Sequence, residues 1–199
     1  MVLRMSDQAV RPAERFGDQF QQVLAAAQVG AGWAAERLWH SLAPTVHGYL
    51  RAQGVIDAED LTSEVFIGVF NGIGTFQGDE ERFRSWVFTI AHRRLTDERR
   101  RVGRRPRPAR FGEEESRAEP LGDSAENTAL RRLGAERVRL LCGRLVPDQR
   151  DVLLLRMVAG LTVDEVAAAL DKSPGAVKQL QRRAVLALRK NFSQEGVPL

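Results

Sequence analysis

The chain has 199 residues, 43% apolar and 28% charged, enough for one ordinary domain or two small ones. Its single cysteine excludes an intramolecular disulfide framework and a zinc site built from several thiolates. A net charge of +4 is too small to identify a partner, so the distribution of charge must do so. The sequence shows neither a secretory signal nor a membrane-spanning apolar stretch, and we expect a soluble cytoplasmic protein without membrane insertion.

Apolar residues recur at helical spacing, and no segment shows the sustained alternation of a β-strand. The predicted helices span 18–28, 33–53, 57–70 and 81–101 in the first part and 128–146, 147–159, 163–170 and 174–191 in the second. The expected fold is all-α, with two small helical domains joined by a flexible linker, the C-terminal one containing a helix-turn-helix. We place the domains at 16–101 and 128–192, with a disordered N-terminus (1–15) and a tail (193–199).

In the helix at 81–101, Phe83, Trp86, Val87 and Ile90 form an apolar stripe that we expect to be buried. Phe88 lies at the border of this stripe, where it either stacks on a base or packs. The opposite face carries hydroxyls, an imidazole and a guanidinium, which suit the backbone and base edges of nucleic acid. These residues are Ser85, Thr89, His92, Thr96 and Arg99. A solvated polar face without a ligand is an equal alternative.

Charge, proline and glycine mark the linker, which we place at 102–127. From Arg93 to Arg110, nine arginines stand against two acids, a net charge of +7. The segment 113–126 reverses this, with six acids and one arginine, a net charge of −5. Three prolines and three glycines fall in the linker, and few apolar groups are available to offset the entropy lost on folding.

The C-terminal part carries the local signals of a helix-turn-helix. Thr162 and Glu165 form a capping box, a tight turn follows the short helix, and Ser173-Pro174 begin the next helix. The outward face of that helix is small, polar and cationic, which suits a DNA groove. Its residues are Ser173, Gly175, Lys178, Gln179, Arg182 and Arg183. The alternative is an ordinary helical hairpin with a solvated basic face.

Taken together, two stretches resemble the extracytoplasmic-function (ECF) sigma factors of bacterial RNA polymerase. In the first part, these are DAEDLTSEVF at 57–66 and FRSWVFTIAH at 83–92. In the second part, they are LVPDQRDVLLLR at 145–156 and the helix-turn-helix. The resemblance runs from about Phe16 to Phe192. It implies a non-enzymatic subunit, without cofactor, that binds core RNA polymerase and promoter DNA. Such a subunit directs promoter recognition, promoter melting and transcription initiation. The resemblance also implies restraint by an anti-sigma protein.

The resemblance also implies roles for individual residues. Contact with core polymerase falls to Asp60, Leu61, Glu64 and Phe66. Capture of an extruded base of the −10 element falls to the loop with Phe76, Gln77, Gly78 and Asp79, beside the face of Ser85, Thr89, His92, Thr96 and Arg99. The helix from Pro174, with Ser173, Gly175, Lys178, Gln179, Arg182 and Arg183, reads the −35 element. Ser63 stands where the family commonly has glutamine, and Leu180-Gln181 where an Arg-Leu pair is usual.

Two other classes of protein compete with this interpretation. A repressor or activator that acts without polymerase explains the helix-turn-helix but gives no role to the segment from Asp60 to Phe66. An enzyme such as a nuclease needs a two-metal carboxylate cluster, a phosphate-binding glycine loop or an activated nucleophile, and the sequence offers none of them, nor a metal site. Cys142 lies on an apolar helical stripe, where we expect a buried packing thiol rather than a redox sensor.

Overall fold

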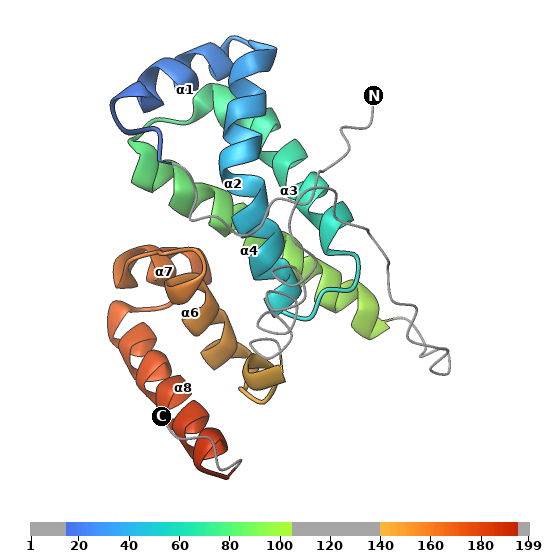
Figure 1. The fold of residues 1–199 in the computed structure, drawn as a ribbon, viewed down its shortest axis with the longest axis vertical. Helices are drawn as coiled ribbons and strands as arrows, with labels where there is room; N and C mark the ends of the chain where they lie inside the picture. The colour runs from blue at the N-terminus through green and yellow to red at the C-terminus, as the bar shows by residue number, and fades with distance from the viewer. Residues whose placement is uncertain (1–14, 105–139, 195–199) are drawn as a thin grey trace, which may run out of the picture.

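The computed structural model describes residues 15–104 and 140–194, and every regular element within them is a helix (Figure 1). The first unit contains η1 (Gly17–Gln19), α1 (Phe20–Gln28), α2 (Gly32–Ala52), α3 (Ala58–Gly72), η2 (Ile73–Thr75) and α4 (Glu80–Arg104). The second contains α6 (Pro147–Met157), α7 (Val163–Leu170) and α8 (Pro174–Gln194), preceded by a helical turn at 140–143. The prediction of an all-α chain with two helical units is confirmed.

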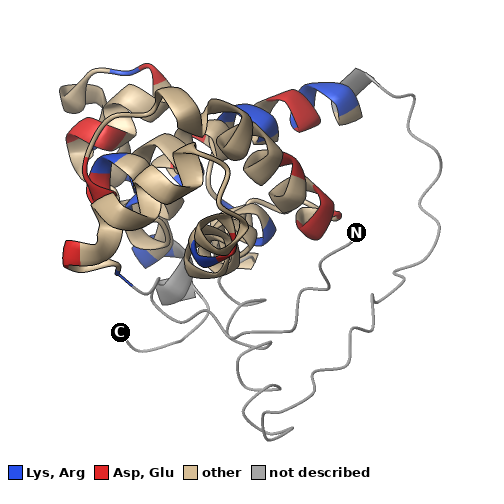
Figure 2. Ribbon diagram, turned by 90° about the horizontal axis from the view of Figure 1, so that it is seen from above, with Lys and Arg blue, Asp and Glu red and all other residues tan. Residues whose placement is uncertain are grey.

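Most helix boundaries lie within a few residues of those predicted. The largest difference at a described helix end in the first unit is in α4, which continues three residues beyond its predicted end to Arg104. Ion pairs between residues one turn apart favour this extension. Arg100 Nη1 lies 3.8 Å from Asp97 Oδ1, and Arg101 Nε lies 2.7 Å from Glu98 Oε2. Figure 2 shows this projecting end with alternating basic and acidic segments. The rest of the predicted linker, most of the helix expected at 128–146 and both chain ends lie outside the described residues.

Aromatic side chains dominate the core of the first unit. Tyr49, Phe66, Phe83 and Phe88 are among its largest fully buried residues. The ring of Phe88 meets that of Tyr49 edge-on, with centroids 5.7 Å apart, so Phe88 packs in the core and is not placed to stack on a base. The predicted stripe of α4 faces this core, with Phe83 and Val87 fully buried and the other two members half-buried at its edge.

A glycine sets the close approach of α3 and α4. A Cβ atom on Gly72 would lie only 3.0 Å from Cζ2 of Trp86. The missing side chain therefore leaves room for the indole, whose ring also packs against Phe83 and Phe76. Trp86 is thus part of the core edge, as its place in the stripe predicts.

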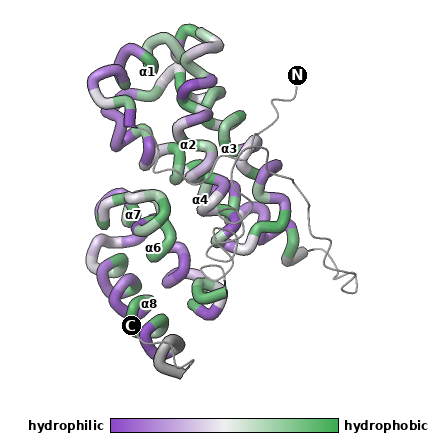
Figure 3. Tube along the Cα trace, viewed as in Figure 1, coloured by the Kyte–Doolittle hydropathy of each residue, from purple (hydrophilic) through white to green (hydrophobic). Residues whose placement is uncertain are grey.

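The second unit buries a continuous run of α6, from Asp151 to Leu155, against the other helices. Along α8 hydrophilic and hydrophobic segments alternate (Figure 3), and Val177 and Ala184 are fully buried. Cys142 is buried too, and burial raises the pKa of its thiol. A neutral, enclosed thiol fits the packing role predicted for it.

The two units pack on each other, with α7 against α4 and α6 against α2 (Figure 1). Buried apolar side chains from both units belong to one continuous cluster. The contact places the second unit over part of the polar face of α4, where it bears directly on the accessibility of the predicted DNA-binding residues.

Candidate nucleic-acid interface

The helix-turn-helix is built by the capping interactions that its sequence predicts. The hydroxyl of Thr162 accepts a bond from the amide of Glu165 at 3.3 Å, and the Glu165 carboxylate accepts one from the amide of Thr162 at 2.6 Å. The turn is closed by Asp171 in the left-handed region with φ 52°, a conformation that aspartate tolerates better than most residues. Ser173 then caps α8 by accepting from the amide of Ala176 at 3.2 Å.

The outward face of α8 is open to solvent. All six of its predicted DNA-binding residues are exposed: Ser173, Gly175, Lys178, Gln179, Arg182 and Arg183. Two side chains of this face are linked by a long hydrogen bond, in which Arg183 Nη2 donates to Gln179 Oε1 at 3.4 Å. Small groups at the helix start with cationic groups one and two turns later match the chemistry of a groove-binding helix.

The polar face of α4 is assembled but only half exposed. Ser85, Thr89, His92, Thr96 and Arg99 share one face of the helix, and each is partly buried. The hydroxyls of Thr89 and Thr96 donate to carbonyl oxygens one turn earlier, both at 2.9 Å. His92 Nδ1 lies 3.1 Å from the hydroxyl of Tyr49, and burial lowers the pKa of the imidazole. At neutral pH this face therefore carries one guanidinium and otherwise uncharged groups.

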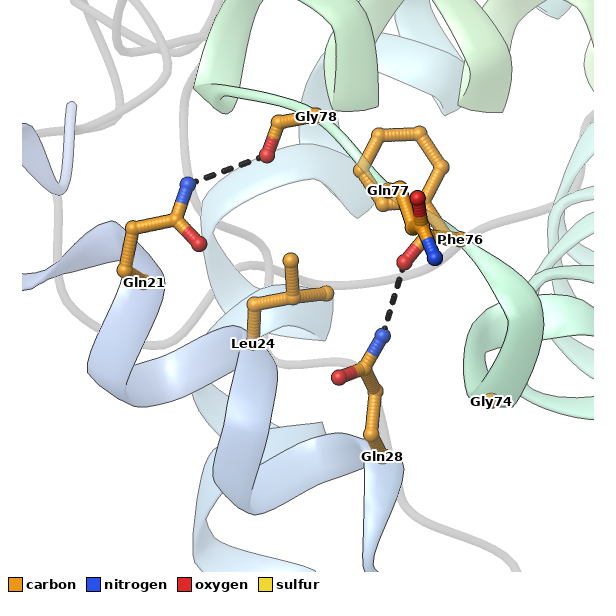
Figure 4. A pocket seen from close by; sticks show the side chains of 7 residues that line it. All are labelled: Gln21, Leu24, Gln28, Gly74, Phe76, Gln77 and Gly78. Carbon is orange, nitrogen blue, oxygen red and sulfur yellow. Dashed lines mark hydrogen bonds between the residues drawn. The ribbon is translucent and has the colours of Figure 1, made fainter.

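The loop before α4 borders a cavity of about 450 Å³. Its walls come from α1, η2 and the loop itself (Figure 4): Gln21, Leu24, Gln28, Gly74, Phe76, Gln77 and Gly78. Gln28 Nε2 donates to the carbonyl oxygens of Phe76 at 2.8 Å and Ile73 at 3.1 Å, and Gln21 Nε2 donates to that of Gly78 at 3.0 Å. The two glutamines thus fix the loop backbone against α1, and sequence reasoning missed both.

Within the loop the predicted residues divide into anchors and accessible groups. Phe76 packs against the rings of Phe83 and Trp86, with centroids 5.2 and 5.1 Å away. Asp79 accepts from the amide of Arg82 at 2.8 Å and so caps the start of α4. Gln77 is exposed at the cavity, and it is the side chain of the loop best placed to meet a ligand.

The four residues predicted to contact core polymerase lie on α3 but differ in exposure. Asp60 and Glu64 are exposed, whereas Leu61 and Phe66 are buried, with the ring of Phe66 edge-on to Trp39 at 4.6 Å. The buried pair therefore fixes the helix that carries the acids. Ile67, 60% exposed, follows at the i+7 position from Asp60, and so one face presents two carboxylates and an apolar group. That spacing was the available signal for Ile67, which sequence reasoning missed.

The part of the chain that the structure describes contains neither a candidate metal site nor a candidate membrane span. No group of three or more His, Cys, Asp or Glu residues there is arranged to hold a metal ion. Among those same residues, no helix is both long and apolar enough to cross a membrane.

Comparison with known proteins gives the same two-part division. Residues 38–105 match the family described as Sigma-70 region 2, and residues 143–190 match Sigma-70, region 4. The chain is 33% identical over 179 residues to the ECF RNA polymerase sigma factor BldN of Streptomyces coelicolor, covering 86% of this chain and 65% of that protein. It is 34% identical over 134 residues to the ECF RNA polymerase sigma factor ShbA of Streptomyces griseus, covering 66% and 69%.

Among solved structures, the chain resembles CnrH in complex with the cytosolic domain of CnrY. The TM-score is 0.66 at 22% identity, with 89% of this chain and 99% of that one covered. This likeness supports the fold described above.

Proposed function

Because the chain belongs to the ECF sigma factors of bacterial RNA polymerase, we propose that it binds core polymerase and directs it to promoters. The family consists of transcription regulators rather than enzymes. In this proposal, the first unit takes the −10 element and the second unit takes the −35 element. The observation that carries it is the capped helix-turn-helix whose second helix presents six exposed polar, small and cationic residues.

In this proposal, the second unit provides the affinity for duplex DNA. Lys178, Arg182 and Arg183 are exposed on α8 and free to approach phosphates or base edges. Each phosphate that a cation neutralises lowers log K by about 0.9 per tenfold rise in salt. Binding by this unit is therefore expected to be strongly dependent on salt.

In the same proposal, the loop and cavity of the first unit carry out strand opening. An extruded base needs a hollow with polar edges, and the open cavity of about 450 Å³ beside Gln77 and Gly78 supports this role. The glutamine bonds from α1 hold the loop in place, so a base meets a site that is already formed. Unstacking a base costs a few kcal/mol, which contacts in a pocket of this kind can offset without ATP.

The exposed face of α3 is proposed to bind core polymerase. Asp60, Glu64 and Ile67 combine two negative charges with an exposed apolar side chain, a mixture suited to a protein partner. A repressor that acts without polymerase has no use for this face. Substitution of Asp60 or Glu64 by lysine therefore distinguishes the two functions, since only a sigma factor loses copurification with core polymerase.

Reconstituted transcription tests the proposal directly. Core polymerase and the purified chain are combined on a library of promoter fragments, and RNA start sites are sequenced. The expected result is a set of start sites that is absent with core polymerase alone and lost with the Glu64→Lys variant. If start sites are unchanged and the chain does not associate with the polymerase, the proposed function is wrong.

We also propose restraint by an anti-sigma protein. CnrH, which shares the fold, was solved with the cytosolic domain of a second protein, CnrY. A sigma factor with these tasks works in the cytoplasm, where its polymerase is. Affinity purification of the tagged chain from its native cells, with mass spectrometry, would identify such a partner.

A further inference from the structure

A buried polar cluster joins the two units. Gln53 Nε2, at the end of α2, donates to Asp151 Oδ1 in α6 at 2.8 Å. Arg99 of α4 donates through Nη1 to the same carboxylate oxygen at 3.3 Å and through Nη2 to Gln53 Oε1 at 2.6 Å. The three side chains close a triangle across the contact, and we refer to Gln53, Arg99 and Asp151 as the latch.

The burial of the latch shows that it is more than a surface ion pair. Asp151 is 6% exposed and Gln53 4% exposed. A carboxylate removed from water is costly unless it is paired and hydrogen-bonded, and here both partners come from the other unit. If the units separate, Asp151 and Arg99 both return to water, so the latch holds only while the units are docked.

The docked unit covers the face of α4 that the proposed function assigns to the −10 element. α7 packs along α4, and the five residues of that face are half-buried. Charges of the second unit reach the face as well, since Asp148, Asp151 and Lys172 all influence His92 electrostatically. By contrast, the six residues of α8 remain exposed in the same arrangement.

Arg99 is the point at which docking and DNA binding compete. A guanidinium binds a carboxylate and a phosphate with the same planar set of donors. In the docked chain, the Asp151 oxygen already occupies Nη1, and the Gln53 oxygen occupies Nη2. A backbone phosphate can take the place of the Asp151 oxygen at Nη1 only if Asp151 leaves.

We propose that the latch is an autoinhibitory contact, in which the Asp151 carboxylate takes the place of a promoter phosphate on Arg99 and keeps the −10 face closed until the two units separate. This inference rests on the proposed function for the identity of the face. Promoter and polymerase then favour the open state, because only that state offers the α4 face to DNA. The closed state keeps its −35 face available.

Two variants test the latch from opposite units. Gln53→Met keeps the side-chain volume, changes no charge and removes both amide bonds. Asp151→Asn removes the charge that holds Arg99. The matched control is Asp148→Asn, which makes the same charge change on the same helix but breaks a bond to Lys172 at 3.0 Å within the second unit.

The full-length variants are compared by small-angle X-ray scattering, hydrogen exchange of the α4 and α7 amides, and anisotropy with a fluorescein-labelled random single-stranded DNA 12-mer. We expect Gln53→Met and Asp151→Asn to raise the radius of gyration and to speed hydrogen exchange of the α4 and α7 amides. Both variants should bind the 12-mer about tenfold more tightly, because a factor of about ten corresponds to the loss of one charge-assisted hydrogen bond. Asp148→Asn should change none of these three quantities to a comparable extent. Circular dichroism checks that all three remain helical.

Two results would overturn the proposal. In the first, both latch variants keep the radius of gyration and DNA affinity of the parent chain. In the second, the units separate but affinity for the 12-mer does not rise beyond that of Asp148→Asn, which makes the contact merely structural. None of these readouts requires polymerase or a known promoter, so failure here is distinct from failure of the proposed function, which would appear as unchanged RNA start sites.

Discussion

The two faces proposed to meet DNA differ in how the folded chain leaves them. The α8 face consists of exposed side chains on a helix whose start is fixed by Ser173 and a preceding capping box. The α4 face is half-buried, its threonines bonded to their own helix and its guanidinium bonded to another unit. Residue types alone do not make a binding surface, because the same donors can be consumed inside the protein. The α8 face is available for encounter, whereas the α4 face needs a prior rearrangement.

Core packing sets the sharpest contrast between these faces. Phe88 is fully buried beneath the α4 face, whereas Leu186 on α8 is 52% exposed. We expect Phe88→Ala to lower the free energy of unfolding by about 3–5 kcal/mol, because it removes transfer energy and leaves a cavity. Leu186→Ala should change it by less than about 0.5 kcal/mol. Urea unfolding followed by circular dichroism measures both, and equal losses would contradict the described packing.

The exposed α8 face should govern the salt dependence of duplex binding. Replacing Arg182 and Arg183 together by alanine is expected to reduce the slope of log K against log salt by about 2, if each neutralises one phosphate. Arg51→Ala is the control, since Arg51 is an exposed arginine on α2 that belongs to neither face. Fluorescence anisotropy with a random-sequence duplex at several salt concentrations gives the slopes. A slope lowered equally by Arg51→Ala would place the duplex contact elsewhere.

Presentation of the α8 face also depends on the cap before it. Thr162→Ala removes the acceptor for the Glu165 amide and is expected to cost about 1 kcal/mol of stability. Ser63→Ala is a useful comparison, because the exposed Ser63 hydroxyl donates within α3 to Glu59 O at 3.2 Å and caps no helix start. Thermal unfolding of both variants measures the difference. If the two variants are equally stable, the capping box contributes no measurable stability to the fold.

Local signals predicted much of this molecule. The capping box, the serine cap and the apolar stripe of α4 each depend on residues within a few positions of one another, and the structure contains all three. The latch could not be predicted this way, since Gln53 and Asp151 are 98 residues apart and no periodicity links them. The α3 segment falls between these cases: the resemblance identified it, but only the helical position of each residue separates exposed Asp60 and Glu64 from buried Leu61 and Phe66.

The smallest expected effect concerns His92, the titratable imidazole of the covered face. Burial lowers its pKa below the ordinary value of 6.5, with opposing influences from Asp151 and Asp148 and reinforcing ones from Arg99 and Lys172. Below pH 6.5 the unfolded chain therefore takes up a proton that the native chain resists, and stability falls as the pH is lowered from 7 towards 5. Above that range both states are neutral at this site, and it contributes no pH dependence.

One group changes stability by at most about 1.4 kcal/mol per pH unit, so the effect is best seen as a difference between variants. His92→Gln, which retains an acceptor for Tyr49, should lose this part of the pH dependence in urea unfolding. An NMR titration of the imidazole reports the cause directly. In the parent chain, its midpoint should lie below 6.5, and in Gln53→Met it should move towards 6.5 as the second unit leaves α4. A midpoint at 6.5 in both would mean that the α4 face is already open in solution, and the contrast with α8 would disappear.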